Sequence, residues 1–173
     1  HYFDLTEDRG VTDTVNELGK SAQSILVPQC GLAPGWVNWS AHDLMSQFDE
    51  LRSAEISAGA LPQNSANDLH YALNWSTTGL VNEYLNTCEI IQNGKISQAP
   101  ALGDLKPVQF NGDQYESFHT SGGLGSLAKY YENKIENLSY KTLRYPGHCN
   151  NMKTIISQFN AERHAIEAYL TET

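Results

Sequence analysis

The chain has 173 residues, of which 40% are hydrophobic and 18% are charged, and its formal net charge is -9. This length and composition are typical of a folded globular protein with one domain, or one domain and part of another. The negative charge disfavours nucleic acid as a partner, and no apolar run reaches the roughly 18 residues that a membrane span requires.

The N-terminal residues predict a strand–helix–strand unit of a parallel sheet. Residues 2–5 indicate a strand, Val11, Val15 and Leu18 recur at helical spacing, and residues 25–27 indicate a short buried strand. The chain begins without a methionine, and its first strand leads directly into a helix cap. We therefore expect a fragment of a longer polypeptide.

The rest of the chain predicts an α+β arrangement, in which helices cover a mixed or antiparallel sheet. Two Asn-Gly pairs, Asn93–Gly94 and Asn111–Gly112, predict tight hairpins, because type I′ turns require positive φ at both central residues. Apolar spacing predicts further strands over 54–60 and 138–145 and helices over 41–51, 124–131 and 152–166, the last as one long helix.

The stretch Ile25–Trp36, ILVPQCGLAPGW, places two glycines and a proline directly after a strand that ends near Cys30. Glycines allow close approach to the backbone, so this turn is expected to leave N–H groups bare for a ligand. The alternative is a buried structural thiol beside a tight turn.

Gly123–Ala128 matches the G-x-G-x-x-A form of a dinucleotide fingerprint. That fingerprint also requires an acidic residue about 20 positions further on, where this chain has Arg144, so nucleotide binding is disfavoured here. Thr120, Ser121 and the amides after Gly122 could instead bind a carboxylate at a helix start. The alternative is a helix cap followed by close packing of glycines.

Arg144 and His148 belong to the segment TLRYPGHC, which predicts a strand end, a turn and a helix start. Arg144 is suited to a two-pronged contact with a carboxylate, and His148 either exchanges protons or caps the helix. The alternative is a surface or packing role, which is the more common one for a lone arginine or histidine. Asn74 begins a segment typical of a capped helix start. The cysteines and histidines show no spacing typical of a metal site.

Several segments together resemble the saccharopine dehydrogenase family, which includes saccharopine reductases, lysine epsilon-dehydrogenase-like enzymes and carboxynorspermidine dehydrogenases. They occur in the order of that family and span most of the chain. The matching segments are YFDLTED at 2–8, PQCGLAPG at 28–35, NWSTTGLVNEY at 74–84, FHTSGG at 118–123 and YKTLRYPGH at 140–148.

The resemblance implies two parts. Residues 1–35 would be the closing strands of a Rossmann-type nucleotide-binding domain. Residues 36–173 would be a substrate-binding and dimerising α+β domain, similar to the C-terminal domain of glyceraldehyde-phosphate dehydrogenase. NAD or NADP would be bound mainly by a domain that this chain lacks, since the glycine fingerprint of the family would lie upstream. Within the chain, the residues implied to face the cofactor are Cys30, Gly31, Pro34 and Gly35.

In such an enzyme, hydride passes between NAD(P) and the C–N bond of a secondary amine or imine made from an amino acid. The resemblance implies acid–base roles for His119 or His148. It implies substrate-binding roles for Asn74, Thr120, Ser121, Gly122 and Arg144.

Further expectations are a small amino-acid-like substrate from lysine or amino-acid metabolism, a homodimer, and no bound metal. Three cysteines without a CxxC pair favour a reducing, cytoplasmic setting. Two other functions remain open. One is a stand-alone, non-catalytic module that binds carboxylates or dimerises. The other is a thiol enzyme that uses Cys30 or Cys149 with His148.

Overall fold

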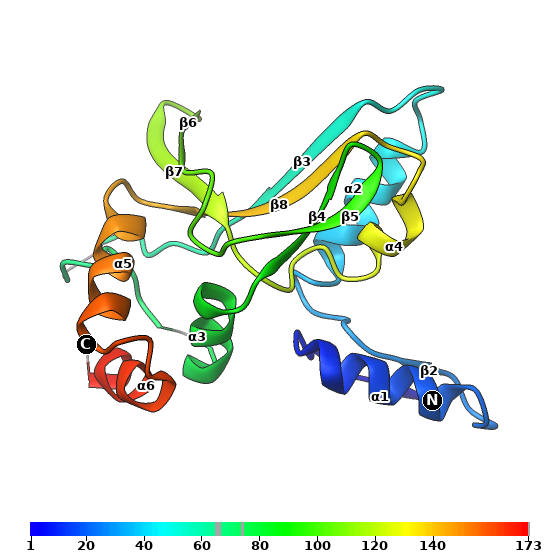
Figure 1. Cartoon of the computed structure of the whole chain (residues 1–173), viewed down its shortest axis with the longest axis horizontal. Helices are drawn as coiled ribbons and strands as arrows, with labels where there is room; N and C mark the ends of the chain where they lie inside the picture. Colours follow the sequence, from blue (N-terminus) through cyan, green and yellow to red (C-terminus); the bar gives the residue numbers. More distant parts are fainter. Residues whose placement is uncertain (65–66, 74, 173) are drawn as a thin grey trace. The chain divides into compact units, whose positions relative to one another are not determined.

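The computed structural model describes residues 1–64, 67–73 and 75–172. The chain forms two compact units, which interleave along the sequence. The first unit comprises His1–Ile56, Glu89–Gln98 and Gly122–Tyr140, and the second comprises Ser57–Cys88, Ala99–Ser121 and Lys141–Thr173. Helices accompany a mostly antiparallel sheet (Figure 1), so the predicted α+β class is confirmed.

The first unit begins with the predicted strand–helix–strand element. Strand β1 (Tyr2–Phe3) pairs in parallel with β2 (Leu26–Val27), and α1 (Arg9–Gly19) connects them (Figure 1). Asp8 starts the helix, because its carboxylate accepts the N–H of Val11 at 2.8 Å.

The remainder of the first unit is a helix pair with part of the antiparallel sheet. Its helices are α2 (Trp36–Met45) and α4 (Leu127–Tyr131). Strand β4 (Cys88–Gln92) lies between β5 (Lys95–Ala99) and the first half of β8 (Asn137–Arg144). Strand β3 (Ser53–Ala58) also pairs with β8. Positive φ angles of 52° and 79° at Asn93 and Gly94 confirm the hairpin predicted between β4 and β5.

In the residues that the structure describes, the second unit contains the other hairpin and helices around an apolar core. Strands β6 (Lys106–Phe110) and β7 (Asp113–His119) turn at Asn111–Gly112, as predicted, and β7 pairs with the second half of β8. The helices are α3 (Thr77–Leu85), α5 (His148–Gln158) and α6 (Arg163–Glu172). Core residues from these elements include Leu80, Tyr84, Phe118, Met152 and Ile166.

The single long helix predicted over 152–166 is wrong. The helical conformation is interrupted between α5 and α6, where Asn160 and Ala161 have φ angles of 49° and 58°. This left-handed conformation is typical of an asparagine that ends a helix. The spacing of the apolar residues continues across this interruption, so the spacing alone predicts one helix. No helix in the described ranges is long and apolar enough to cross a membrane.

The start of α5 is capped by a distant carboxylate. Glu116 on β7 accepts the N–H of Gly147 at 2.9 Å and that of Cys149 at 2.6 Å. Removal of Glu116 leaves the buried amide of Cys149 and the partly buried amide of Gly147 unpaired. We therefore expect Glu116→Ala to lower the free energy of unfolding by about 2–3 kcal/mol. Urea denaturation measures this change. Glu50→Ala, at an exposed position, is the control, and equal stability of the two variants would contradict the capping role.

Candidate functional site

Three residues selected from the sequence converge on the C-terminal end of α3. Ser121 donates its hydroxyl to the carbonyl of Asn82 and its N–H to the carbonyl of Glu83, both at 3.0 Å. Arg144 Nε donates to Tyr84 Oη at 3.1 Å, and His148 Nε2 lies 2.9 Å from the same oxygen. We call this cluster the α3 site, defined as Asn82–Tyr84, Ser121, Arg144 and His148.

Local sequence explains why α3 presents these groups. Ser76 caps the helix by accepting the N–H of Gly79 at 3.1 Å, which confirms the predicted capped start. Leu80, Val81 and Tyr84 are buried in the core and hold the helix in place. Asn74, the other residue selected in this segment, lies outside the described residues.

Arg144 is a buried cation within the α3 site. It is 4% exposed, and its guanidinium carbon lies 4.8 Å from the centre of the Tyr71 ring. Its Nη2 is 3.9 Å from Glu83 Oε2. Its Nη1 donates a hydrogen bond to the carbonyl of the preceding residue, Leu143, at 2.9 Å. The carboxylate and the ring therefore offset the cost of burying this charge.

His148 is enclosed by the same network. Burial lowers the pKa of His148 to about 4, with the charge of Arg144 acting in the same direction, so its ring is neutral at pH 7. Its Nδ1 lies 2.7 Å from the Leu69 carbonyl, so both ring nitrogens have partners. The catalytic role of His148 stays a prediction, and its position behind Tyr84 favours a role through that residue.

His119 is the last residue of strand β7, and Thr120 follows it, next to Ser121. His119 Nε2 lies 3.9 Å from Asp104 Oδ2. The side chains of Lys141 and Lys106 hold the pKa of Asp104 down at about 2, so this carboxylate is ionised at neutral pH. Thr120 is 2% exposed, and its Oγ1 has no hydrogen-bond partner in the described part of the chain. A buried hydroxyl of this kind is costly unless a ligand pairs with it.

The glycine stretch that follows is packed against the chain itself. Helix α4 begins only at Leu127, so the amides after Gly122 do not start a helix as predicted. The Ser121 amide and hydroxyl already donate to carbonyls of α3. The substrate-binding roles of Thr120, Ser121 and Gly122 therefore stay predictions, without the helix start that motivated them.

Gly123 has no space for a side chain, since a Cβ there would overlap the ring of Tyr140. We expect Gly123→Ala to lower the free energy of unfolding by about 1–3 kcal/mol through overpacking. Thermal unfolding measures the loss. The matched control is Gly19→Ala, where the nearest atom to a new Cβ is Leu26 Cβ at 4.0 Å. A neutral effect of Gly123→Ala would show that the ring moves aside at little cost.

In the first unit, the turn after Cys30 also closes on its own backbone. Gly35 has a φ of 138°, and a Cβ at this position would overlap the backbone of Gly31. The N–H of Gly35 donates to Asn38 Oδ1 at 2.6 Å, so this amide is not left bare for a ligand as expected. The glycines of this turn are therefore required by the approach of the chain to itself.

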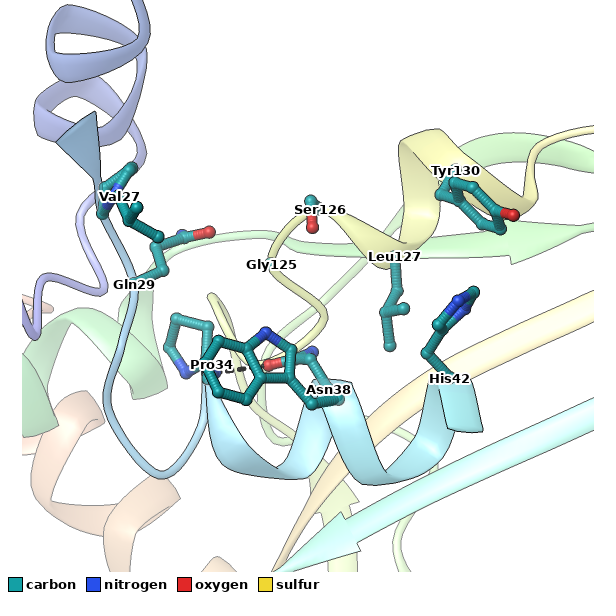
Figure 2. A pocket seen from close by; sticks show the side chains of 12 residues that line it. Val27, Gln29, Pro34, Asn38, His42, Gly125, Ser126, Leu127 and Tyr130 are labelled. Carbon is teal, nitrogen blue, oxygen red and sulfur yellow. Dashed lines mark hydrogen bonds between the residues drawn. The ribbon is translucent and has the colours of Figure 1, made fainter. Parts of the chain in front are cut away.

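A pocket of about 290 Å³ lies beside this turn, within the first unit (Figure 2). Gln29 points into it from one side, and His42 and Tyr130 lie together at the other, with ring centres 5.0 Å apart. The other lining residues include Pro34, Gly35, Asn38, Trp39 and Ser126. Pro34 and Gly35, two of the four residues predicted to face the cofactor, thus line this pocket.

Cys30 and Gly31, the other two predicted cofactor residues, have neighbours within the turn. Cys30 is half-buried, and its thiol lies 3.3 Å from the Val27 carbonyl. Gly31 forms an isolated bridge with Gly35. Cys149, in the second unit, is fully buried, and burial raises the pKa of its thiol. A protonated, enclosed thiol argues against the thiol-enzyme alternative for Cys149.

Asn38, Glu83 and Tyr84 are candidates that the sequence patterns did not single out. Asn38 donates to the carbonyls of Gly123 and Leu124 at 2.8 and 2.9 Å, which links α2 to the glycine stretch. The usual capping signature has Ser or Thr followed three positions later by Glu or Gln, so Gly35 and Asn38 do not match it and the sequence offers no such signal for Asn38. The described residues contain no cluster of three or more His, Cys, Asp or Glu side chains that could hold a metal ion.

Comparison with known proteins identifies the family. The family model for the saccharopine dehydrogenase C-terminal domain matches residues 31–167. The chain belongs to this family. The match includes the whole α3 site and confirms the resemblance expected from the sequence.

A solved structure of apo histidine-tagged saccharopine dehydrogenase (L-Glu forming) from Saccharomyces cerevisiae has a similar fold. The identity is 23% and the TM-score 0.58, over 82% of this chain and 34% of the yeast chain. The chain therefore spans about a third of the length of the yeast enzyme. The similarity at this identity supports the fold, including its α+β sheet with helices.

Proposed function

We propose that this chain is the substrate-binding part of a saccharopine dehydrogenase-like, NAD(P)-dependent oxidoreductase. The enzyme would act on the C–N bond of a secondary amine or imine derived from an amino acid. The observation that carries this proposal is the convergence of Ser121, Arg144 and His148 on α3 in a chain that belongs to the family.

The α3 site would bind a substrate carboxylate. Arg144 supplies a guanidinium, which is suited to paired contacts with a carboxylate. The buried Thr120 hydroxyl, one residue before Ser121, would supply another donor. Tyr71 contacts Arg144 and also lines a cavity of about 410 Å³, so a ligand of amino-acid size in this cavity would be separated from the guanidinium by the Tyr71 ring.

The residues of the first unit fit only one end of a nicotinamide cofactor. Gln29, Trp39 and Tyr130 line the pocket near Pro34 and Gly35, and would hold a flat, amide-bearing ring. The segment 4–8 between β1 and α1 contains no glycine, so it provides no phosphate-binding loop of the dinucleotide type. Nicotinamide, when bound, accepts or supplies the hydride. NAD or NADP would need its phosphates bound by further polypeptide.

His119 remains the better-placed candidate for proton transfer, because His148 is held between two partners. The Nε2 atom of His119 lies 3.9 Å from the carboxylate of Asp104, which would orient the ring for proton transfer. Further parts of the proposal are a homodimer, a cytoplasmic location in keeping with three free cysteines, and a role in lysine or amino-acid metabolism.

Turnover tests this function. The purified protein, including the polypeptide that binds the cofactor phosphates, is given L-saccharopine with NAD or NADP, and formation of the reduced nicotinamide is followed by its absorbance. This chain alone is expected to be inactive. We expect turnover with one of the two cofactors, and its loss in Arg144→Ala. Binding of L-saccharopine without cofactor binding or turnover would favour a non-catalytic carboxylate-binding module instead.

A further inference from the structure

A chain of hydrogen bonds runs behind Arg144 in the second unit. Arg144 Nε lies 3.1 Å from Tyr84 Oη, and Tyr84 Oη lies 2.9 Å from His148 Nε2. His148 Nδ1 then lies 2.7 Å from the carbonyl oxygen of Leu69. This series of hydrogen bonds thus connects the end of β8 to α3, to the start of α5 and to the loop before α3.

The proton positions in this chain are determined by its two ends. A guanidinium only donates hydrogen bonds and a carbonyl oxygen only accepts them. Tyr84 Oη therefore accepts from Arg144 and directs its own proton to His148 Nε2, and His148 Nδ1 carries the proton that is donated to Leu69. The donor and the acceptor of each hydrogen bond are therefore determined, so the series has a single direction and contains a neutral histidine.

This arrangement leaves one side of the guanidinium for other contacts. Nε is bound to Tyr84 and Nη1 donates to the Leu143 carbonyl. Nη2 makes no hydrogen bond to any residue that the structure describes, and its nearest carboxylate oxygen, Glu83 Oε2, is 3.9 Å away. Because the guanidinium is planar, the hydrogen bonds of Nε and Nη1 determine the direction in which Nη2 points.

We propose that Tyr84 and His148 are positioning residues that hold the Nε edge of Arg144, so that its Nη2 edge is presented to the carboxylate of an amino-acid ligand. This inference rests on the proposed function, since it assigns Arg144 to ligand binding. Phe118 supports the arrangement, because its ring stacks on that of His148 with an interplanar angle of 9°. Tyr84 and His148 do not touch the ligand themselves.

Calorimetric titration of the protein with L-saccharopine tests the proposal. We expect Tyr84→Phe to raise the Kd about tenfold, because the guanidinium loses its fixed orientation, a change equivalent to about 1.4 kcal/mol. The matched control is Tyr131→Phe. Tyr131 is as buried as Tyr84, at 4% against 3% exposure, and its hydroxyl also contacts a histidine, His42 Nδ1, at 2.8 Å. Tyr131→Phe should leave the Kd within about twofold.

His148 provides the conservative rescue. We expect His148→Gln to retain much of the affinity, since a glutamine carbonyl can accept the hydroxyl proton of Tyr84, whereas His148→Leu should weaken binding as much as Tyr84→Phe does. Equal Kd values for Tyr84→Phe and Tyr131→Phe, both folded by circular dichroism, would overturn the positioning role.

A second measurement separates this inference from the proposed function. The exchange of the Arg144 Nε–H with water, followed by NMR, does not depend on any ligand. We expect slow exchange in the parent protein and in Tyr131→Phe, and exchange at least about tenfold faster in Tyr84→Phe. If the parent protein fails to bind L-saccharopine, the proposed function fails. If the exchange rate is unchanged in Tyr84→Phe, the positioning role fails.

Discussion

Arg144→Ala is expected to lower the free energy of unfolding by about 3–5 kcal/mol, because it leaves the carboxylate of Glu83 buried without its cationic neighbour. The side chains of Arg144 and Glu83 are only 5% and 11% exposed. The substitution also removes the hydrogen bond to Tyr84 and the contact with the Tyr71 ring. Urea denaturation, followed by circular dichroism, measures the loss.

A double variant shows how much of this loss comes from the charge. Adding Glu83→Gln to Arg144→Ala removes the unbalanced carboxylate, so the double variant should be more stable than the sum of the single effects predicts. Arg52→Ala, at an exposed position, is the control and should change stability by less than about 0.5 kcal/mol. Strictly additive single effects would contradict a coupling between Arg144 and Glu83.

Phe118→Ala is expected to cost about 3–5 kcal/mol, because it opens a cavity in a fully enclosed part of the core. Phe118 is 0% exposed and packs against the rings of Tyr84 and His148, with centroid distances of 6.1 and 6.3 Å. The loss should appear as a lower midpoint in urea denaturation. Weaker binding of L-saccharopine should accompany it, since the ring supports the chain behind Arg144.

The same hairpin provides the control for Phe118. Phe110 lies at the end of β6 and is 61% exposed, so Phe110→Ala should change stability by no more than about 0.5 kcal/mol. Phe118→Leu retains most of the volume and should cost less than Phe118→Ala. If Phe118→Ala and Phe110→Ala have the same midpoint, the core surrounding the α3 site is not as closely packed as described.

Features encoded locally could be predicted from the sequence. Asn93–Gly94 and Asn111–Gly112 specified their hairpins, since few residues other than Asn and Gly adopt the required angles. Ser76 specified the start of α3 through its capping hydroxyl. The assignment of Arg144 and Ser121 to one site is implied by the family resemblance, and both residues contact α3, at Tyr84 and Asn82 respectively.

Features that depend on distant contacts could not be predicted in this way. Glu116 and the N–H of Gly147 are far apart in the sequence, and only the pairing of β7 with β8 brings this carboxylate to the start of α5. No sequence pattern singles out Tyr84, and its role is visible only with Arg144 and His148 on either side. The sequence predicts that the glycines at 31 and 35 leave backbone N–H groups bare for a ligand. In the structure the two glycines instead allow their own backbones to approach each other closely.

The most direct test of the central claim is a crystal structure of the protein with L-saccharopine bound. The account predicts a ligand carboxylate oxygen within about 3 Å of the Arg144 guanidinium, with the hydrogen bond between Arg144 Nε and Tyr84 Oη retained. A ligand bound away from α3, with no ligand carboxylate near the Arg144 guanidinium, would contradict it.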